Sequence, residues 1–149
     1  MTNIKPATRH TWQRAAVRDL LEGGEEFRTA QQIHDRLRDE GARVGLATVY
    51  RALQSMADAG EVDVIRTPEG EAAYRHCSEG HHHHLVCRGC GFSVEIEATF
   101  VESWAAQIAS QHGFTDTGHE LELFGLCREC GQRSKLGNDR SALSRCQVA

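Results

Sequence analysis

Two short cysteine motifs carry the clearest chemistry in this sequence. Cys87 and Cys90 are separated by two residues, and Cys127 and Cys130 repeat that spacing further along the chain. Each Cys-x-x-Cys pair can present two thiolates from one tight turn, and four thiolates complete the tetrahedral shell of a Zn²⁺ ion with no open position. The sequence therefore predicts a closed, structural zinc site, with a redox-active dithiol or two disulfides as the alternatives.

A run of four histidines precedes the first cysteine pair, in the stretch SEGHHHHLVCRGCG. Successive side chains of a β-strand point to opposite faces, so His82 and His84 would share one face of a strand here. His81 and His83 would share the other face. Imidazole is a common metal ligand, so one strand could begin two separate metal sites. A solvated polar strand without a function is the plainer alternative.

Further candidate ligands lie on either side of the histidine run. Asp63 and Cys77 lie upstream, while Glu102 and His119 lie downstream. Carboxylate, thiolate and imidazole groups all bind zinc, but nothing in the spacing dictates which of these residues joins which pair of histidines. Cys146 is most simply a free thiol on a polar tail.

Composition narrows the class of protein. The 149 residues suit one domain or two small ones. No apolar run approaches the roughly 20 residues of a membrane helix, and the first ten residues lack the apolar segment of a signal peptide. We therefore expect a cytoplasmic protein. The net charge of −4 gives no sign of a nucleic-acid partner, and neither half of the chain is a polybasic module, so any contact with DNA needs a local arrangement of basic side chains.

Three helices and a hairpin fit the first half of the chain. Helices are expected at about 11–22, from the capping box at Thr29 to Gly41, and at about 46–59, followed by two short strands around 68–70. The second and third helices are joined by the short turn GARVG, which is the plan of a helix-turn-helix. A hairpin after that motif makes a winged helix.

The helix expected at 46–59 is the candidate reader of DNA. Its apolar residues recur at inward spacing, and its outer face is small, polar and aromatic, with one arginine. Such a face can enter a major groove, although a solvated face in a small helical bundle fits the pattern equally well. The residues predicted to contact DNA are Arg9, Ala47, Thr48, Tyr50, Arg51 and Gln54.

The second half of the chain combines strands with one helix. Strands are expected over 82–87, 92–97 and 119–127, with a helix over 98–113 before the last of them. This order makes an α+β unit in which the two cysteine pairs would tie the ends of the sheet together. The chain after Arg133 is polar and is predicted to be mobile.

Together these segments resemble one known family. The run ATVYRAL at 47–53, then HHHHLVCRGCG, then HGF followed by HELELFGLCREC, is similar to the ferric uptake regulator family of metal-dependent repressors over about residues 8–131. The resemblance implies an α+β fold with an N-terminal winged helix-turn-helix domain and a C-terminal α/β dimerisation domain. It also implies a homodimer that binds an inverted repeat of double-stranded operator DNA when it is loaded with metal.

The resemblance also divides the chain and groups its ligands. It implies a DNA-binding domain over 1–77, a hinge over 78–81, a zinc-binding dimerisation domain over 82–133 and a flexible tail over 134–149. Up to three Zn²⁺ ions per subunit are expected. The structural site would be formed by Cys87, Cys90, Cys127 and Cys130. A regulatory site at the hinge would be formed by Asp63, Cys77, His82 and His84. A second regulatory site, within the dimerisation domain, would be formed by His81, His83, Glu102 and His119.

The ligand types favour zinc as the metal that is sensed. Members of the family respond to iron, zinc, manganese, nickel or peroxide. One thiolate, two imidazoles and one carboxylate at the hinge suit tetrahedral zinc, and Cys77 makes the chain resemble the zinc uptake regulators of the family, which control zinc homeostasis. A sensor of another metal or of peroxide is the nearest alternative.

Two further classes of function fit less well. A zinc enzyme needs an open coordination position for water, whereas both histidine sites can reach four protein ligands. A passive zinc store does not explain the helix-turn-helix. We therefore expect a repressor that is not an enzyme and has no small-molecule substrate.

Overall fold

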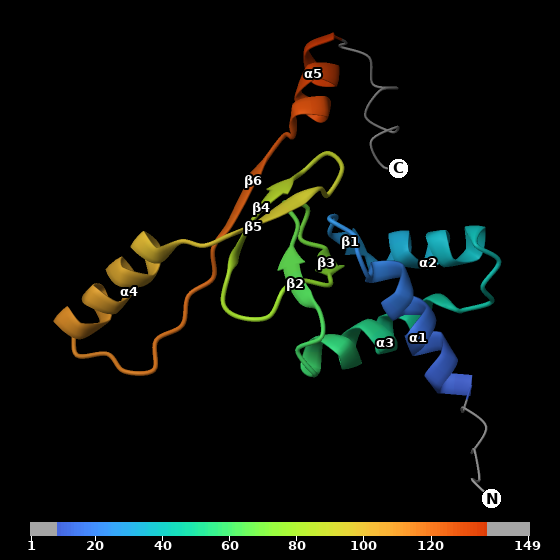
Figure 1. The fold of residues 1–149 in the computed structure, drawn as a ribbon, viewed down its shortest axis with the longest axis horizontal. Coiled ribbons are helices and arrows are strands. Elements are labelled where there is room, and N and C mark those ends of the chain that lie inside the picture. Colours follow the sequence, from blue (N-terminus) through green and yellow to red (C-terminus); the bar gives the residue numbers. More distant parts are fainter. Residues whose placement is uncertain (1–8, 137–149) are drawn as a thin grey trace, which may run out of the picture. The chain divides into compact units, whose positions relative to one another are not determined.

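A computed structural model describes residues 9–136, with side chains from Trp12 onward. The chain divides into two units, Met1–Cys77 and Ser78–Ala149 (Figure 1). Within the described residues, no helix combines the length and the apolar character that crossing a membrane would require. The mixture of helices and sheets confirms the predicted α+β class.

The first unit contains three helices, α1 (Arg9–Leu21), α2 (Ala30–Asp39) and α3 (Leu46–Asp58). The predicted capping box is present at the start of α2. The N–H of Gln32 donates to Thr29 Oγ1 at 3.3 Å, and the N–H of Thr29 donates to the side-chain oxygen of Gln32 at 2.9 Å. These bonds satisfy two donors that a helix start leaves open, which explains why α2 begins at this position.

A small antiparallel sheet completes the winged helix. Strands β2 (Asp63–Arg66) and β3 (Ala72–Arg75) form the predicted hairpin, in which the N–H of Gly70 donates to the carbonyl of Thr67 at 2.8 Å. Strand β1 (Arg28–Thr29) pairs with the other edge of β3, so the strand order is β1-β3-β2. The sequence analysis did not predict β1 because two residues are too few to show an alternating pattern.

Helix α3 lies at the centre of the apolar core of the first unit. Val49, Leu53 and Met56 are fully buried, and their helical spacing places them on one face. Val17 and Leu21 of α1 belong to the same core. Burial of this face determines which side of α3 is left exposed.

An ion-pair cluster joins α1 to the end of α3. The Nη2 atom of Arg14 donates to Glu61 Oε1 at 2.5 Å, and the Nη2 atom of Arg18 donates to Oε2 of the same carboxylate at 2.7 Å. Arg14 also donates to Ser55 Oγ at 3.0 Å. The hydrogen bond from Arg18 is the main reason that the pKa of Glu61 is lowered. These contacts fix the orientation of α1 relative to α3, in addition to the apolar packing between the two helices.

The second unit is built on a three-stranded sheet. Strand β4 (His83–Cys87) is central, with β5 (Ser93–Ile96) antiparallel on one side and β6 (Glu122–Gly125) parallel on the other. Helix α4 (Thr99–Gln111) lies between β5 and β6 in the sequence, and helix α5 (Arg128–Leu136) follows β6. The predicted order of two strands, a helix and a strand is therefore correct.

The last strand starts later than predicted, and α5 was not predicted. The strand begins at Glu122 rather than at His119, so His119 lies in the segment that leads into it. Helix α5 includes residues 134–136, which the sequence analysis placed in the tail. Its segment RECGQRSKL has too few apolar residues to show a helical period, and only Cys130 is buried. The rest of the predicted tail, including Cys146, lies outside the described residues.

Helix α4 has an exposed apolar face. No residue of α4 is buried, and Phe100 and Trp104 are 81% and 56% exposed. Ile108 follows four residues after Trp104, so these three side chains lie on one side of the helix. A contiguous exposed apolar face of this kind is typical of a surface that takes part in an interaction.

Leu53→Ala should lower the free energy of unfolding of the first unit by about 2–5 kcal/mol, because it removes buried atoms and leaves a cavity beneath α3. Arg36→Ala, at an exposed position of α2, should change that free energy by less than about 0.5 kcal/mol. Urea unfolding followed by far-ultraviolet circular dichroism compares the two variants. Equal unfolding midpoints would show that this core does not hold α3.

Candidate metal centres and nucleic-acid interface

The four predicted zinc-binding cysteines come together in the second unit. Cys87 ends β4 and Cys90 lies in the turn after it, while Cys127 precedes α5 and Cys130 lies in its first turn. Their four sulfur atoms all lie within 4.8 Å of one another. The Sγ atoms of Cys90 and Cys127 are 3.8 Å apart, well beyond the disulfide bond length of about 2.05 Å. Tetrahedral Zn–S bonds of about 2.3 Å would hold two sulfurs about 3.8 Å apart.

The two cysteine pairs use similar local turns. The N–H of Gly91 donates to the carbonyl of Cys87 at 2.9 Å, and the N–H of Gly131 donates to the carbonyl of Cys127 at 2.8 Å. Gly91 has a φ of 78°, a conformation that glycine adopts without steric cost. Each turn directs both of its thiols to one side, which is why a spacing of two residues suits a shared ion.

The pKa values of the cysteine thiols are also consistent with the binding of a cation. Burial of the Cys87 thiol raises its pKa, but hydrogen bonds from the backbone N–H groups of Cys127, Cys90 and Gly89 outweigh burial and lower this pKa to about 6. Burial and the neighbouring thiols raise the pKa of Cys90 to about 11. One thiolate is therefore ready to bind, and a divalent ion would supply the positive charge that lets the others ionise.

A second cluster forms where three imidazoles converge on one carboxylate. The Nε2 atoms of His81 and His83 each lie 2.8 Å from Glu102 Oε1, and Nε2 of His119 lies 2.9 Å from it. The His119 nitrogen is also 3.3 Å from each of the other two nitrogens. Tetrahedral Zn–N bonds of about 2.0–2.1 Å would give a similar spacing of about 3.3 Å. Lone pairs that face one point repel each other unless protons or a cation lie between them.

Helix α4 supplies the negative charge of this cluster. Hydrogen bonding from His83 has the largest effect on Glu102, and together with the bonds from His119 and His81 it lowers the pKa of this carboxyl to about 2 despite partial burial. Glu102 lies in the first turn of α4, where the open N–H groups also favour an anion. Glu102 is therefore ionised at neutral pH and can serve as a metal ligand.

The histidine run alternates in the expected way, although β4 begins only at His83. The rings of His81 and His83 have centroids 4.8 Å apart, and those of His82 and His84 are also 4.8 Å apart. The side chains therefore point to alternating sides already at His81, before the strand begins. This alternation separates the four imidazole rings into two pairs. His83 is only 3% exposed, which argues against the plain reading of a solvated polar strand.

The four residues of the predicted hinge site are divided between the two units. Asp63 begins β2, and Cys77 is the last residue of the first unit. His82 and His84 belong to the second unit. The Nδ1–H of His82 donates to the carbonyl of Gly80 at 2.9 Å, so this histidine would bind a metal through Nε2. Assembly of these four ligands around one ion stays a prediction.

Helix α3 exposes the face that was predicted to read DNA. The exposed residues are Ala47, Tyr50, Arg51 and Gln54, and Thr48 beside them is half-buried. Arg51 Nη2 lies 3.4 Å from Thr48 Oγ1, and Gln54 Nε2 donates to Asp58 Oδ1 at 2.9 Å. A guanidinium, a phenol and an amide on one face are groups that can contact base edges. Arg9 lies in α1, but its side chain is outside the described part of the chain.

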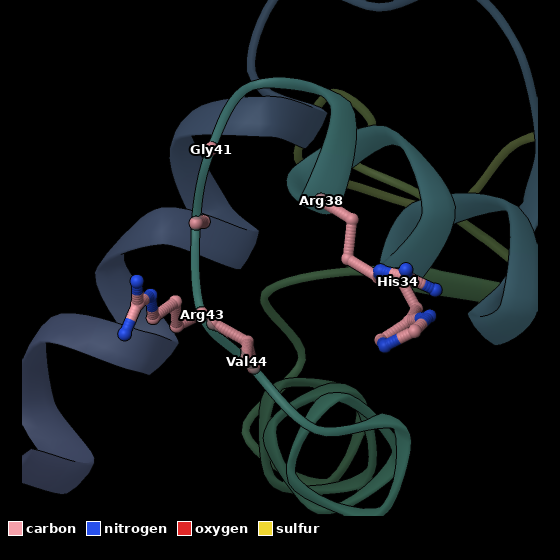
Figure 2. A pocket seen from close by; sticks show the side chains of 6 residues that line it. His34, Arg38, Gly41, Arg43 and Val44 are labelled. Carbon is pink, nitrogen blue, oxygen red and sulfur yellow. The ribbon is translucent and has the colours of Figure 1, made fainter.

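A hollow of about 410 Å³ adjoins the turn between α2 and α3 (Figure 2). It is lined by His34, Arg38, Gly41, Ala42, Arg43 and Val44. Figure 2 shows that the side chains of Arg38 and His34 lie on one side of the turn, whereas that of Arg43 points to the other. The two guanidinium groups do not converge, so the hollow is not a built site for an anion.

One residue that matters for the four-cysteine cluster was not predicted. Gly89 lies between the first two cysteines, and a Cβ added to it would lie 3.0 Å from Cys130 Sγ and 3.6 Å from Cys87 Sγ. The distance to Cys87 Sγ is an ordinary contact, but the distance to Cys130 Sγ is so short that a side chain at position 89 would push this sulfur from its place. The available signal was its place inside Cys-x-x-Cys, but the crowding comes from Cys130, which is distant in the sequence.

Gly89→Ala should weaken zinc retention at the four-cysteine cluster and lower the melting temperature, because overpacking at such a contact costs about 1–3 kcal/mol. Gly125→Ala is the matched control, since a Cβ there meets open space. Zinc content after dialysis against graded chelator, together with calorimetry, measures both effects. If the two variants retain zinc equally, the crowding argument is wrong.

Comparisons with known proteins agree with this arrangement. The model of the ferric uptake regulator family matches residues 5–124. The zinc uptake regulation protein of Mycobacterium tuberculosis is 55% identical over 122 residues, which cover 82% of this chain and 94% of that protein.

Two solved structures extend the agreement. The crystal structure of FurB from M. tuberculosis, a zinc uptake regulator, is 54% identical and covers 84% of this chain and 97% of that chain, with a TM-score of 0.52. A zinc uptake regulator in complex with zinc and DNA is 27% identical and covers 85% of this chain and 86% of that chain, with a TM-score of 0.64. The predicted resemblance is confirmed, and this chain belongs to the ferric uptake regulator family.

Proposed function

We propose that this protein is a zinc-responsive transcriptional repressor that binds operator DNA as a homodimer and controls genes of zinc uptake and zinc homeostasis. The observation that carries the proposal is the convergence of His81, His83 and His119 on Glu102, in a chain whose α3 exposes a polar reading face. The M. tuberculosis relative, at 55% identity, is a zinc uptake regulation protein, which supports the same metal.

The ligand chemistry supports zinc at all three sites, so up to three ions per subunit are proposed. Four thiolates form a closed shell whose role is structural. Three imidazoles with one carboxylate, and the hinge set with its thiolate at Cys77, are also four-ligand shells of the borderline kind that zinc prefers. Sensors of iron or manganese rely more on oxygen ligands and higher coordination numbers, which makes another metal the second candidate.

The hinge set is proposed as the switch. Asp63 and Cys77 belong to the first unit, and His82 and His84 belong to the second. If one ion holds ligands from both units, the angle between the units becomes restricted. We propose a DNA-binding domain over 1–77, a hinge over 78–81 and a dimerisation domain over 82–133, so that metal occupancy is coupled to the placement of the reading helix.

A homodimer explains two exposed surfaces. The apolar face of α4, with Phe100 and Trp104 exposed, would be covered by the partner subunit. The reading faces of two α3 helices would then meet the two half-sites of an inverted repeat in successive major grooves. The family is one of transcriptional regulators rather than enzymes, and we propose that the protein acts in the cytoplasm, where its operator DNA lies.

Arg51→Ala and Tyr50→Ala should each weaken operator binding by about 1–3 kcal/mol, because each removes a contact from the face that enters the groove. Zinc content and the dimer should be unchanged. Lys135→Ala, an exposed basic residue of α5, serves as the charge control. Fluorescence anisotropy with labelled operator measures the affinities, and wild-type affinity in both test variants would mean that another face reads the DNA.

Operator binding at buffered free zinc tests the function itself. The wild-type protein should bind operator only when zinc is present, and Cys77→Ala should abolish that response because the two units lose a shared ligand. Glu102→Ala should keep partial binding that needs more zinc, since its cluster lies within one unit and acts only through that unit's rigidity.

Two outcomes would contradict these assignments. A wild-type protein that binds operator equally well without zinc, or only with manganese or iron, would refute the zinc-responsive function. A Cys77→Ala variant that responds like the wild type, beside a Glu102→Ala variant that does not respond, would reverse the roles of the two regulatory sites.

A further inference from the structure

The chain immediately after Cys77 is held by a carboxylate of the second unit. The backbone N–H of Ser78 donates to Glu95 Oε1 at 2.9 Å, and the hydroxyl of Ser78 donates to Oε2 of the same carboxylate. The two residues are seventeen positions apart. One carboxylate therefore binds both donors of the first residue of the second unit.

Glu95 also occupies a defined place relative to the histidines. It lies in β5, directly opposite His84 in β4, and side chains of directly opposite residues in an antiparallel pair lie on the same face. The ring of His82 lies 4.8 Å from that of His84, measured between centroids. The anchor for Ser78 is thus on the same face of the sheet as the two histidines of the hinge set.

A second contact orders the end of the same short segment. The Nδ1–H of His82 donates to the carbonyl of Gly80 at 2.9 Å, and Gly80 has a φ of 99°, in the region that favours glycine. This bond commits Nδ1 of His82, so a metal would have to be bound through Nε2. The segment from Ser78 to His82 is therefore anchored at Ser78 by Glu95 and carries one internal hydrogen bond near its other end.

We propose that Glu95 is a positioning residue for the hinge metal site. By holding Ser78, it fixes the residue that directly follows Cys77, so that less of the chain between Cys77 and the two histidines has to be ordered when metal binds. Without this contact the exposed segment 78–81 would be ordered only on metal binding, at a cost in conformational entropy. The inference rests on the proposed function, because it takes these three residues as ligands.

Glu95 could act through its hydrogen bonds to Ser78 or through its negative charge, and a substitution by glutamine separates the two roles. A glutamine at position 95 keeps an oxygen that accepts from the Ser78 N–H and gains an amide that donates to the Ser78 hydroxyl, but it carries no charge. If Glu95 instead acted as a metal ligand or by attracting the cation, glutamine would fail much as alanine does. Glu97, exposed and two residues further along, offers the same charge without the contact to Ser78.

The test uses the full-length protein with its four-cysteine cluster loaded with zinc and the other sites emptied by mild chelation. Co²⁺ is then titrated in, and the absorption band of a thiolate bound to cobalt reports occupancy by Cys77. Glu95→Ala should weaken this binding by on the order of tenfold, while Glu95→Gln and Glu97→Ala should match the wild type. Before cobalt is added, amide exchange of Ser78 by NMR should be faster in Glu95→Ala alone.

Each other outcome overturns the proposal in a distinct way. Equal cobalt affinity and equal Ser78 exchange in Glu95→Ala and the wild type would show that Glu95 positions nothing. A Glu95→Gln variant as weak as Glu95→Ala would assign the effect to charge. If the wild-type protein failed to bind operator with zinc, the proposed function would fall, whereas the exchange of the Ser78 amide would still decide whether Glu95 holds the segment.

Discussion

The convergence of four sulfur atoms within 4.8 Å of one another is the constraint on which the second unit depends. Among its described residues, the buried apolar side chains are only Val86, Cys87 and Cys130. Three short strands that bury so little apolar surface within one chain offset only a small part of the entropy of ordering that chain. A bound ion that joins the end of β4 to the start of α5 would supply the missing stabilisation, because metal-binding energy in such a unit is folding energy.

The first unit is stabilised in a different way. Its helices enclose an apolar core that includes Val49, Leu53 and Met56, and the pairing of Arg14 and Arg18 with Glu61 ties α1 to the end of α3. The exposed polar face of α3 is therefore shaped by apolar packing and ion pairs of the first unit. In the function proposed above, metal would change DNA affinity by changing where this face is held, which is a coupling between two sites and not a folding event.

The single run of four histidines supplies ligands to two separate candidate metal sites. Alternation along the chain sends His81 and His83 toward Glu102 and His119 within one unit. It sends His82 and His84 to the other side of the strand. The first pair meets its partners within one unit, whereas the ligands proposed to join the second pair, Asp63 and Cys77, belong to the first unit.

The sequence by itself determined the ligand types, the two cysteine turns, the alternation of the histidines and the winged helix-turn-helix, because these follow from local spacing, capping and periodicity. The motifs also identified the family. Tertiary structure alone decided the rest: the pairing of β1, the helix after Cys127, the crowding of Gly89 by Cys130 and the hold of Glu95 on Ser78. These features arise from contacts between residues far apart in the sequence, or from backbone groups that every residue carries. A local pattern of residue types therefore cannot predict these features.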